Sequence, residues 1–134
     1  MEKSILVAAD IGHPELCRKT LGVARQVGGN QSRIIALYVA ADIPSFIAVE
    51  LPKGLLEKNI ARARAELGAL ADEAGAESEV RSGHPAVKIL EYAKEIGAGL
   101  IVIAPHRPGL QDYFLGSTAA RVVRHAECAV LVDR

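Results

Sequence analysis

Tryptophan is absent from this sequence of 134 residues, and the aromatic side chains are limited to two Phe and three Tyr. The core must therefore be aliphatic, and half of all residues are indeed apolar. A net charge is also absent, because 16 basic residues balance 16 acidic ones. Since a nucleic-acid backbone demands a basic protein face, we do not expect nucleic acid to be the main partner.

Long hydrophobic runs are missing as well. The apolar runs of this chain fall far short of the ~20 residues that a membrane-spanning helix needs. The chain opens directly into an apolar strand, without the pattern of a secretion signal. We therefore expect a cytoplasmic protein without membrane association, folded as one domain over residues 1–134.

Cysteine is scarce, and the two cysteines, Cys17 and Cys128, form no C-x-x-C motif. We expect both to be reduced side chains that pack as small hydrophobic groups. His125 lies three residues before Cys128, but two residues do not make a zinc site, which usually needs four ligands.

The pattern that is present alternates short apolar runs with helix-length segments. Strands are predicted at Ser4–Ala9, Ile34–Val39, Ala76–Arg81, Leu100–Ala104 and Ala129–Val132. Helices are predicted from Pro14 to Gly28, from Lys53 to Ala74, from Pro85 to Ile96 and from Gly116 to His125. Residues 40–51 are expected to be irregular, and the polar third strand is expected at an edge of the sheet. This order predicts an α/β fold, an open five-stranded parallel sheet with helices on both faces.

The richest site chemistry lies where the last helix begins, at Gly116, Ser117 and Thr118. The first turn of a helix carries unpaired backbone N–H groups and the positive end of the helix dipole, which attract a phosphate. Glycine would let the phosphate approach, and the hydroxyls could bind its oxygens. The alternative is an ordinary helix cap. Neither G-x-x-x-x-G-K-[ST] nor G-x-G-x-x-G occurs in the chain to support the phosphate interpretation.

Other candidate residues follow the predicted strands. In such folds ligands bind at the carboxyl ends of the strands, where the strand order reverses. Asp10 follows the first strand, Val39 ends the second, and Ala104 to Gly109 follow the fourth. An adenosine near Asp10 and Val39, with its phosphates over Gly116, is consistent with this arrangement. For Asp10 the alternative is an aspartate that only starts a turn.

Three segments carry a resemblance to a known family. They are ILVAAD at the start, GHPAVKILEYAKEIGAGLIVIA before the last third, and LGSTAARVVRHAECAVLV at the end. The chain resembles the universal stress proteins over nearly its whole length. The resemblance implies an adenine-nucleotide α-hydrolase-like fold whose strands, numbered along the chain, lie in the order 3-2-1-4-5. It also implies a homodimer through the last strand, Ala129 to Val132, with a tetramer as a further form.

The same resemblance implies a nucleotide site. ATP-binding members carry G-x2-G-x9-G-[ST], of which Gly116-Ser117 matches the end, while Ala104 and His106 stand where glycines are expected. The sequence of this loop is closer to that of a subgroup that reads A-S-H-R-P. The resemblance implies that Arg107 of this chain could offset phosphate charge. The implied cofactor is ATP, or AMP or ADP, and the sequence does not indicate magnesium. The implied binding residues are Ala8, Asp10, Val39, Ala104, His106, Arg107, Gly109, Gly116, Ser117 and Thr118.

Three functions are compatible with these features. The first is a stress-associated regulatory protein that binds ATP, with at most slow hydrolysis. The second is a nucleotide-free relative that acts as a protein-interaction module, which the residues Ala104 and His106 favour. The third is an adenylyl-transferring enzyme, which ranks last because no nucleophile with a neighbouring base and no lysine occurs in the loop.

Overall fold

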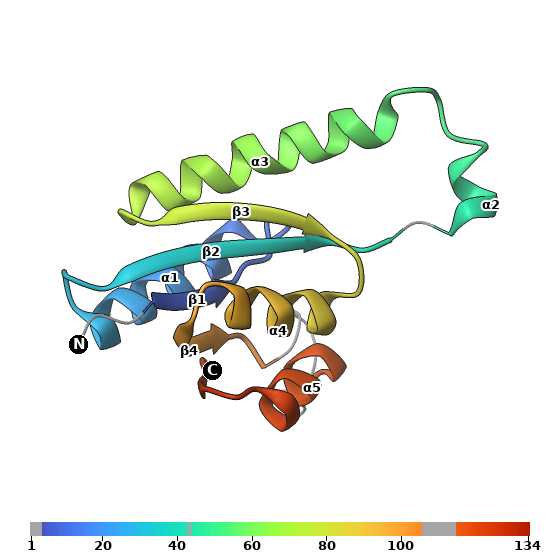
Figure 1. The fold of residues 1–134 in the computed structure, drawn as a ribbon. Helices are drawn as coiled ribbons and strands as arrows, with labels where there is room; N and C mark the ends of the chain where they lie inside the picture. Colours follow the sequence, from blue (N-terminus) through green and yellow to red (C-terminus); the bar gives the residue numbers. More distant parts are fainter. Residues whose placement is uncertain (1–3, 43, 106–114) are drawn as a thin grey trace.

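The computed structural model describes residues 4–42, 44–105 and 115–134, and its centre is a five-stranded parallel sheet (Figure 1). The strands are β1 (Ser4–Ala8), β2 (Arg33–Ala40), β3 (Glu77–Ser82), β4 (Ala98–Ile103) and β5 (Ala129–Val132). They lie in the order β3-β2-β1-β4-β5, so the predicted fold class and strand order are confirmed. The helices are α1 (Pro14–Gly28), α2 (Ser45–Ala48), α3 (Leu55–Glu73), α4 (Pro85–Glu95) and α5 (Ser117–His125).

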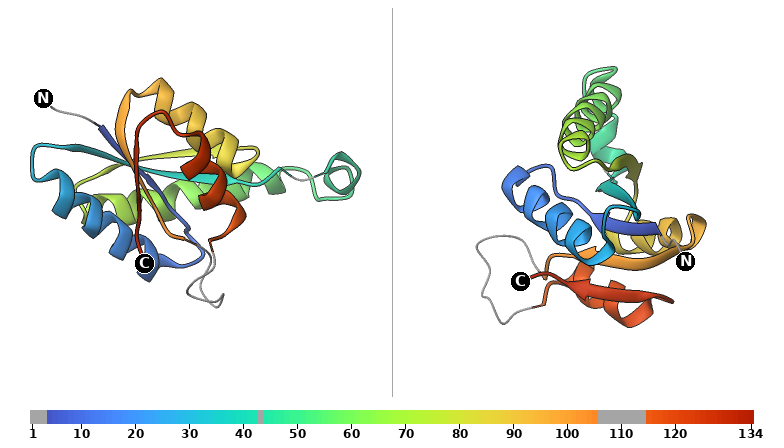
Figure 2. Two further views of the ribbon diagram at one scale, coloured as in Figure 1. Left: turned by 90° about the horizontal axis from the view of Figure 1, so that it is seen from below. Right: turned by 90° about the vertical axis from the view of Figure 1, so that its left-hand side faces the viewer.

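Helices cover both faces of the sheet, α1 and α3 on one side and α4 and α5 on the other (Figure 2). Alternate side chains of β1 enter the two layers, since Ile5 and Val7 pack against α1 and α3 while Leu6 packs toward α4 and α5. All three are at most 4% exposed. A strand buried on both faces needs apolar side chains at every position, which is why its sequence is a continuous apolar run.

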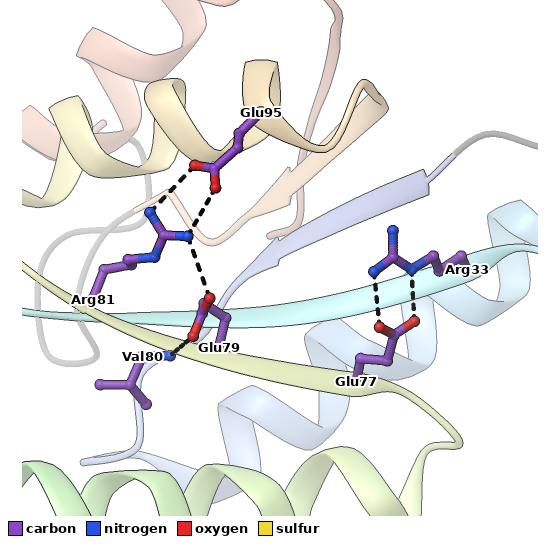
Figure 3. A network of polar contacts seen from close by, with 6 residues as sticks. All are labelled: Arg33, Glu77, Glu79, Val80, Arg81 and Glu95. Atoms are coloured by element: carbon purple, nitrogen blue, oxygen red, sulfur yellow. Dashed lines mark hydrogen bonds and ion pairs between the residues drawn. The ribbon is translucent and has the colours of Figure 1, made fainter.

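The third strand lies at a sheet edge, as its polar sequence predicted. Arg33 on β2 makes a paired contact with Glu77, its Nε lying 2.7 Å from Oε2 and its Nη2 2.9 Å from Oε1 (Figure 3). Further along β3, Arg81 joins Glu79 to Glu95 of α4, with N–O distances of 3.3 and 3.1 Å (Figure 3). The Arg33 guanidinium lowers the pKa of the Glu77 carboxyl. Charged side chains along an edge strand hinder its pairing with another chain.

Two element boundaries differ from the sequence prediction by two residues, and the others agree to within one residue. Helix α3 begins at Leu55 rather than Lys53, because Gly54 before it adopts a left-handed conformation with φ of 82° that a helix cannot contain. Strand β4 begins at Ala98 rather than Leu100. Ala98 pairs with Ser4 and Leu100 with Ile5, so Gly99 is an extra residue in the ladder, the mark of a β-bulge.

The segment expected to be irregular contains the short helix α2 of four residues. One turn is too short to show a helical period in the sequence, so the pattern could not reveal it. The connection from β2 through α2 to α3 projects beyond the carboxyl edge of the sheet (Figure 1). Within the described part of the chain, no helix combines the length and apolar character that crossing a membrane requires.

Candidate functional site

The candidate site lies at the carboxyl edge of the sheet, where β1 and β4 are neighbours. The chain builds β1, β2 and β3 outward in one direction and then crosses over to place β4 on the other side of β1. In parallel α/β sheets ligands usually bind at such a reversal, outside the carboxyl ends of the two strands, and we call this place the crevice. Asp10 follows β1 by two residues, and Ala104 follows β4 directly.

Asp10 forms a tight turn between β1 and α1. Its Oδ1 accepts a hydrogen bond from the backbone N–H of Gly12 at 2.9 Å, and its carbonyl accepts one from His13 N–H at 3.1 Å. The turn interpretation is therefore correct, but it uses only one carboxylate oxygen. The second, Oδ2, lies 3.8 Å from His13 Nε2, and the side chain is 40% exposed. Asp10 can thus hold the turn and still accept a hydroxyl of a ligand.

Gly12 is a residue of this turn that the sequence analysis did not single out. A Cβ at this position would lie 3.2 Å from Asp10 Oδ1, closer than an ordinary van der Waals contact. A side chain there would press against the carboxylate that the turn positions. The spacing Asp-x-Gly was the available signal in the sequence, because glycine is frequent next to such aspartate turns.

The start of α5 is tied to the end of β4. Gly116 N–H donates to the carbonyl of Pro105 at 2.7 Å, and the Gly116 carbonyl accepts from Ala120 N–H at 2.8 Å. Among the described residues, no side chain caps this helix. Ser117 is exposed and Thr118 half-buried, so both side chains are at least partly accessible. Gly116 has an ordinary φ of −63°, so its backbone angle does not require glycine.

The structure brings seven of the ten predicted site residues to one edge of the sheet. These are Ala8, Asp10, Val39, Ala104, Gly116, Ser117 and Thr118. Ala8 and Val39 are partly buried on the α4 and α5 side of the sheet. His106, Arg107 and Gly109 lie outside the described residues, so their predicted contacts with phosphate stay predictions.

A groove of about 510 Å³ opens beside this crevice, between α3 and the carboxyl ends of β2 and β3. We call it the α3 groove. It is lined by Ile11, Tyr38, Ala40, Ala41, Asp42, Leu56, Asn59, Ile60, Arg62, Ala63, Glu66 and Ser82. None of the ten predicted site residues contributes, although Ile11 adjoins Asp10. Tyr38 packs on the α1 and α3 side of the sheet and Val39 on the opposite side, so groove and predicted crevice flank β2.

The sequence does not reveal the α3 groove, because Leu56 and Ile60 have the spacing of helix residues that pack on a sheet. Leu56 is instead 39% exposed, and Ile60 lines the groove. The reason is length, since α3 has 19 residues, or about 28 Å at the usual rise. Strand β3 has only six residues, or about 20 Å, so the first turns of α3 extend past the sheet.

Neither cysteine has the environment of a nucleophile. Cys17 and Cys128 are free thiols. Burial, and secondarily the charge of Asp10, raises the pKa of Cys17, and burial raises the pKa of Cys128. Both thiols therefore stay protonated near neutral pH. In residues 4–42, 44–105 and 115–134, no three His, Cys, Asp or Glu side chains gather as a metal site would require.

Comparison with known proteins identifies the family. The profile of the universal stress protein family matches residues 1–134. The universal stress protein MJ0531 of Methanocaldococcus jannaschii is 31% identical over 127 residues, covering 88% of this chain and 72% of the relative. A universal stress protein of Thermus aquaticus is 29% identical over 138 residues, with both chains fully covered.

Solved structures agree with the fold. UspA of Lactobacillus plantarum is 24% identical, with a TM-score of 0.73 over 98% of this chain and 97% of that one. A universal stress protein in complex with cAMP is 21% identical, with a TM-score of 0.68 over 99% of this chain and 97% of that one. The match of the family profile over the whole chain, together with the relatives of similar sequence, shows that this chain belongs to the universal stress protein family.

Proposed function

We propose that this protein is a stress-associated regulator that binds an adenine nucleotide in the crevice between β1, β4 and α5. The observation that carries the proposal is the start of α5. The hydrogen bond from Gly116 N–H to the Pro105 carbonyl (2.7 Å) holds the first turn, which no side chain of the described residues caps, at the end of β4. Backbone amides and a helix dipole at that point suit a phosphate group.

The remaining residues fit a nucleoside with its phosphates on α5. Asp10 keeps one carboxylate oxygen available for a ribose hydroxyl. Ala8, Val39 and Ala104 supply small or apolar surfaces at the strand ends for the base. Ser117 and Thr118 offer hydroxyls to the phosphate, and His106, Arg107 and Gly109 belong to the proposed site as residues of the intervening loop. The cAMP complex of a relative with the same fold supports an adenine nucleotide as the ligand class.

The direct experiment has two parts. The purified protein is denatured and its supernatant analysed by ion-exchange chromatography for co-purified nucleotide. Isothermal titration calorimetry then measures the affinities for ATP, ADP, AMP, cAMP and GTP. We expect adenine nucleotides to bind and GTP to bind much more weakly. Absence of binding for the whole series would exclude the proposal and favour the nucleotide-free interaction module.

The Asp10→Ala variant should bind every adenine nucleotide more weakly, by about 1.5–3 kcal/mol, the usual contribution of a charged hydrogen bond. The loss should be equal for ATP and AMP, because the contact is to the ribose that both contain. Calorimetry on Asp10→Asn serves as the control, since its amide oxygen can still accept from Gly12 N–H and keep the turn. A loss confined to ATP would contradict the ribose assignment.

We also propose a homodimer through β5. This strand lies at a sheet edge, its residues Val130, Leu131 and Val132 are only half-buried, and Ala129 is exposed. An apolar edge strand can pair with the same strand of a second copy around a two-fold axis. We propose as well that nucleotide binding is coupled to the formation of this dimer, and that the protein is cytoplasmic.

Val130→Pro should convert the dimer to monomers, because proline removes a backbone donor from the edge strand. Ala129→Lys tests the same edge by placing a charge on an exposed side chain, with little effect on the fold. Multi-angle light scattering gives the mass, and circular dichroism verifies that each variant is folded. Wild-type monomers at micromolar concentration would rule out the β5 dimer.

A further inference from the structure

The connection between β2 and α3 ends in an exposed apolar tip. We call the described residues 41, 42 and 44–54 the arm and Phe46, Ile47 and Val49 its tip. Their side chains are 72%, 41% and 81% exposed. Figures 1 and 2 show the arm extending away from the layers of the fold, with α2 at its far end. Single exposed apolar residues are ordinary, but three within four positions of a projecting segment mark an interaction surface.

The α3 groove lies at the base of the same arm. Ala40 and Ala41, where the arm leaves β2, form one side of the groove. Leu56 and Ile60, where the chain has returned in α3, form another. None of the tip residues lines the groove of its own chain. Each copy therefore presents an unfilled apolar groove and an unburied apolar tip.

Size and charge of the two surfaces match. A groove of about 510 Å³ falls in the range that accommodates compact apolar groups of ligand size, so several side chains fit. Arg62 and Glu66 line the groove and are exposed, one helical turn apart. The arm carries Glu50 next to the tip and Lys53 further on, both exposed. In the described part of the chain none of these four takes part in an ion pair of the structure, so each can meet an opposite charge on a partner.

We propose that the tip of each arm inserts into the α3 groove of a second copy of this chain. Both surfaces belong to one chain and adjoin each other, so a two-fold axis beside the arm brings each tip to the other copy's groove. Such an isologous contact closes on itself and leaves neither tip exposed. The contact buries the tip side chains against Leu56 and Ile60, and pairs Glu50 with Arg62 and Lys53 with Glu66.

The arm contact is separate from the β5 edge. Strand β5 ends the sheet on one side, while the α3 groove lies over β2 and β3, on the far side of β1. A protein that uses only the arms forms a dimer, and one that uses both contacts forms a closed tetramer when the two two-fold axes are perpendicular and intersect. The partner's arm also lies next to Ile11 and hence beside Asp10, so the assembly borders the proposed nucleotide crevice.

The tip is tested with the double variant Phe46→Ser/Val49→Ser, whose self-association is measured by sedimentation velocity. All variants also carry Ala129→Lys, which removes pairing through β5. We expect Ala129→Lys alone to self-associate with concentration, and the tip variant to associate on the order of 100-fold more weakly, as removal of two buried apolar side chains implies. Val27→Ser/Val123→Ser removes two other exposed apolar side chains (56% and 45%) and should leave association unchanged. Equal association of the tip variant and this control would overturn the proposal.

Disulfide trapping tests the position of the tip directly. Val49→Cys and Asn59→Cys are placed in separate chains with tags of different mass, both in a Cys128→Ser background. We expect mild oxidation of the mixture to give the mixed disulfide dimer, because Asn59 lines the groove. Ala65→Cys, exposed on α3 but outside the groove, replaces Asn59→Cys in the control and should give little product.

Three results would contradict the proposal. The first is equal trapping by Asn59→Cys and Ala65→Cys, and the second is no mixed disulfide at concentrations where the protein associates. The third is a Val49→Cys/Asn59→Cys double variant that forms its disulfide only within one chain, which would mean that the arm folds onto its own groove. If association of the wild-type chain did not depend on the arm, the proposal would also be wrong, and the tip would bind a different protein. Failure of nucleotide binding would leave the arm proposal unaffected.

Discussion

Gly116→Val is expected to lower the affinity for ATP by about 100-fold or more, the loss of two or more charge-assisted hydrogen bonds to phosphate. Gly116 precedes the first turn of α5, and a branched side chain there would hold a phosphate away from the backbone amides. The fold should tolerate the change, because the φ of −63° and ψ of 160° at Gly116 suit any residue. Calorimetry gives the affinity and thermal unfolding the stability.

The matched control is Gly22→Val, the same substitution on the exposed side of α1. A Cβ at Gly22 would meet nothing within 4 Å, so the variant should bind nucleotide like the wild type. Unchanged ATP affinity in a folded Gly116→Val protein would show that the phosphates do not lie on α5. The proposed crevice would then lose the observation that carries it.

Arg25→Met is expected to cost about 2–4 kcal/mol of unfolding free energy, because one guanidinium joins the ends of two helices. Its Nη1 donates to the carbonyls of Gly29 (3.0 Å) and Ser32 (3.1 Å). Its Nη2 donates to those of Gly75 (3.0 Å) and, more weakly, Ala74 (3.5 Å). These carbonyls follow the carboxyl ends of α1 and α3, where the helix dipoles favour a cation. Methionine keeps the apolar stem but leaves the carbonyls without their donor.

Urea or thermal unfolding measures this loss, which corresponds to a fall in Tm of roughly 10 °C for a chain of this size. Arg18→Met is the matched control on the same helix. Arg18 also reaches the α3 side of the molecule, but through one exposed ion pair with Glu73 at 2.9 Å. Exposed pairs contribute little, so its effect should be much smaller. Equal stabilities of the two variants would show that the Arg25 contacts contribute no more than a surface ion pair.

The layers of this protein can be predicted from its amino-acid sequence. Side chains such as Leu6, Ile35 and Leu37 recur in uninterrupted apolar runs, and only strands covered on both faces can bury them all. The charged alternation of Glu77 to Arg81 likewise indicated an edge strand. These properties are local, because each residue's polarity reports the environment of its own strand. Local patterns cannot predict the strand order. That prediction came from the resemblance of three segments of the chain to the universal stress proteins.

The candidate site was predictable only in part. Gly116 and Asp10 could be proposed because helix starts and strand ends carry recognisable residues, and parallel strands bring them to one edge. The turn that Asp10 shares with Gly12 was one of two open interpretations, and the side-chain hydrogen bond shows the turn while leaving the ribose contact a proposal. Whether a carboxylate oxygen accepts a hydrogen bond within the turn depends on how far it lies from a backbone amide. That distance cannot be predicted from the sequence.

The groove, the arm and the Arg25 contacts could be seen only in the tertiary structure. Leu56 and Ile60 have the spacing of buried helix residues, yet α3 is longer than the strands it covers, so its first turns pass the sheet and form a groove. Arg25 contacts carbonyls 49 and 50 residues away, at the end of another helix. Helical periodicity predicts which residues share a face of a helix. Which residues that face contacts depends on the lengths and relative positions of the packed helices and strands.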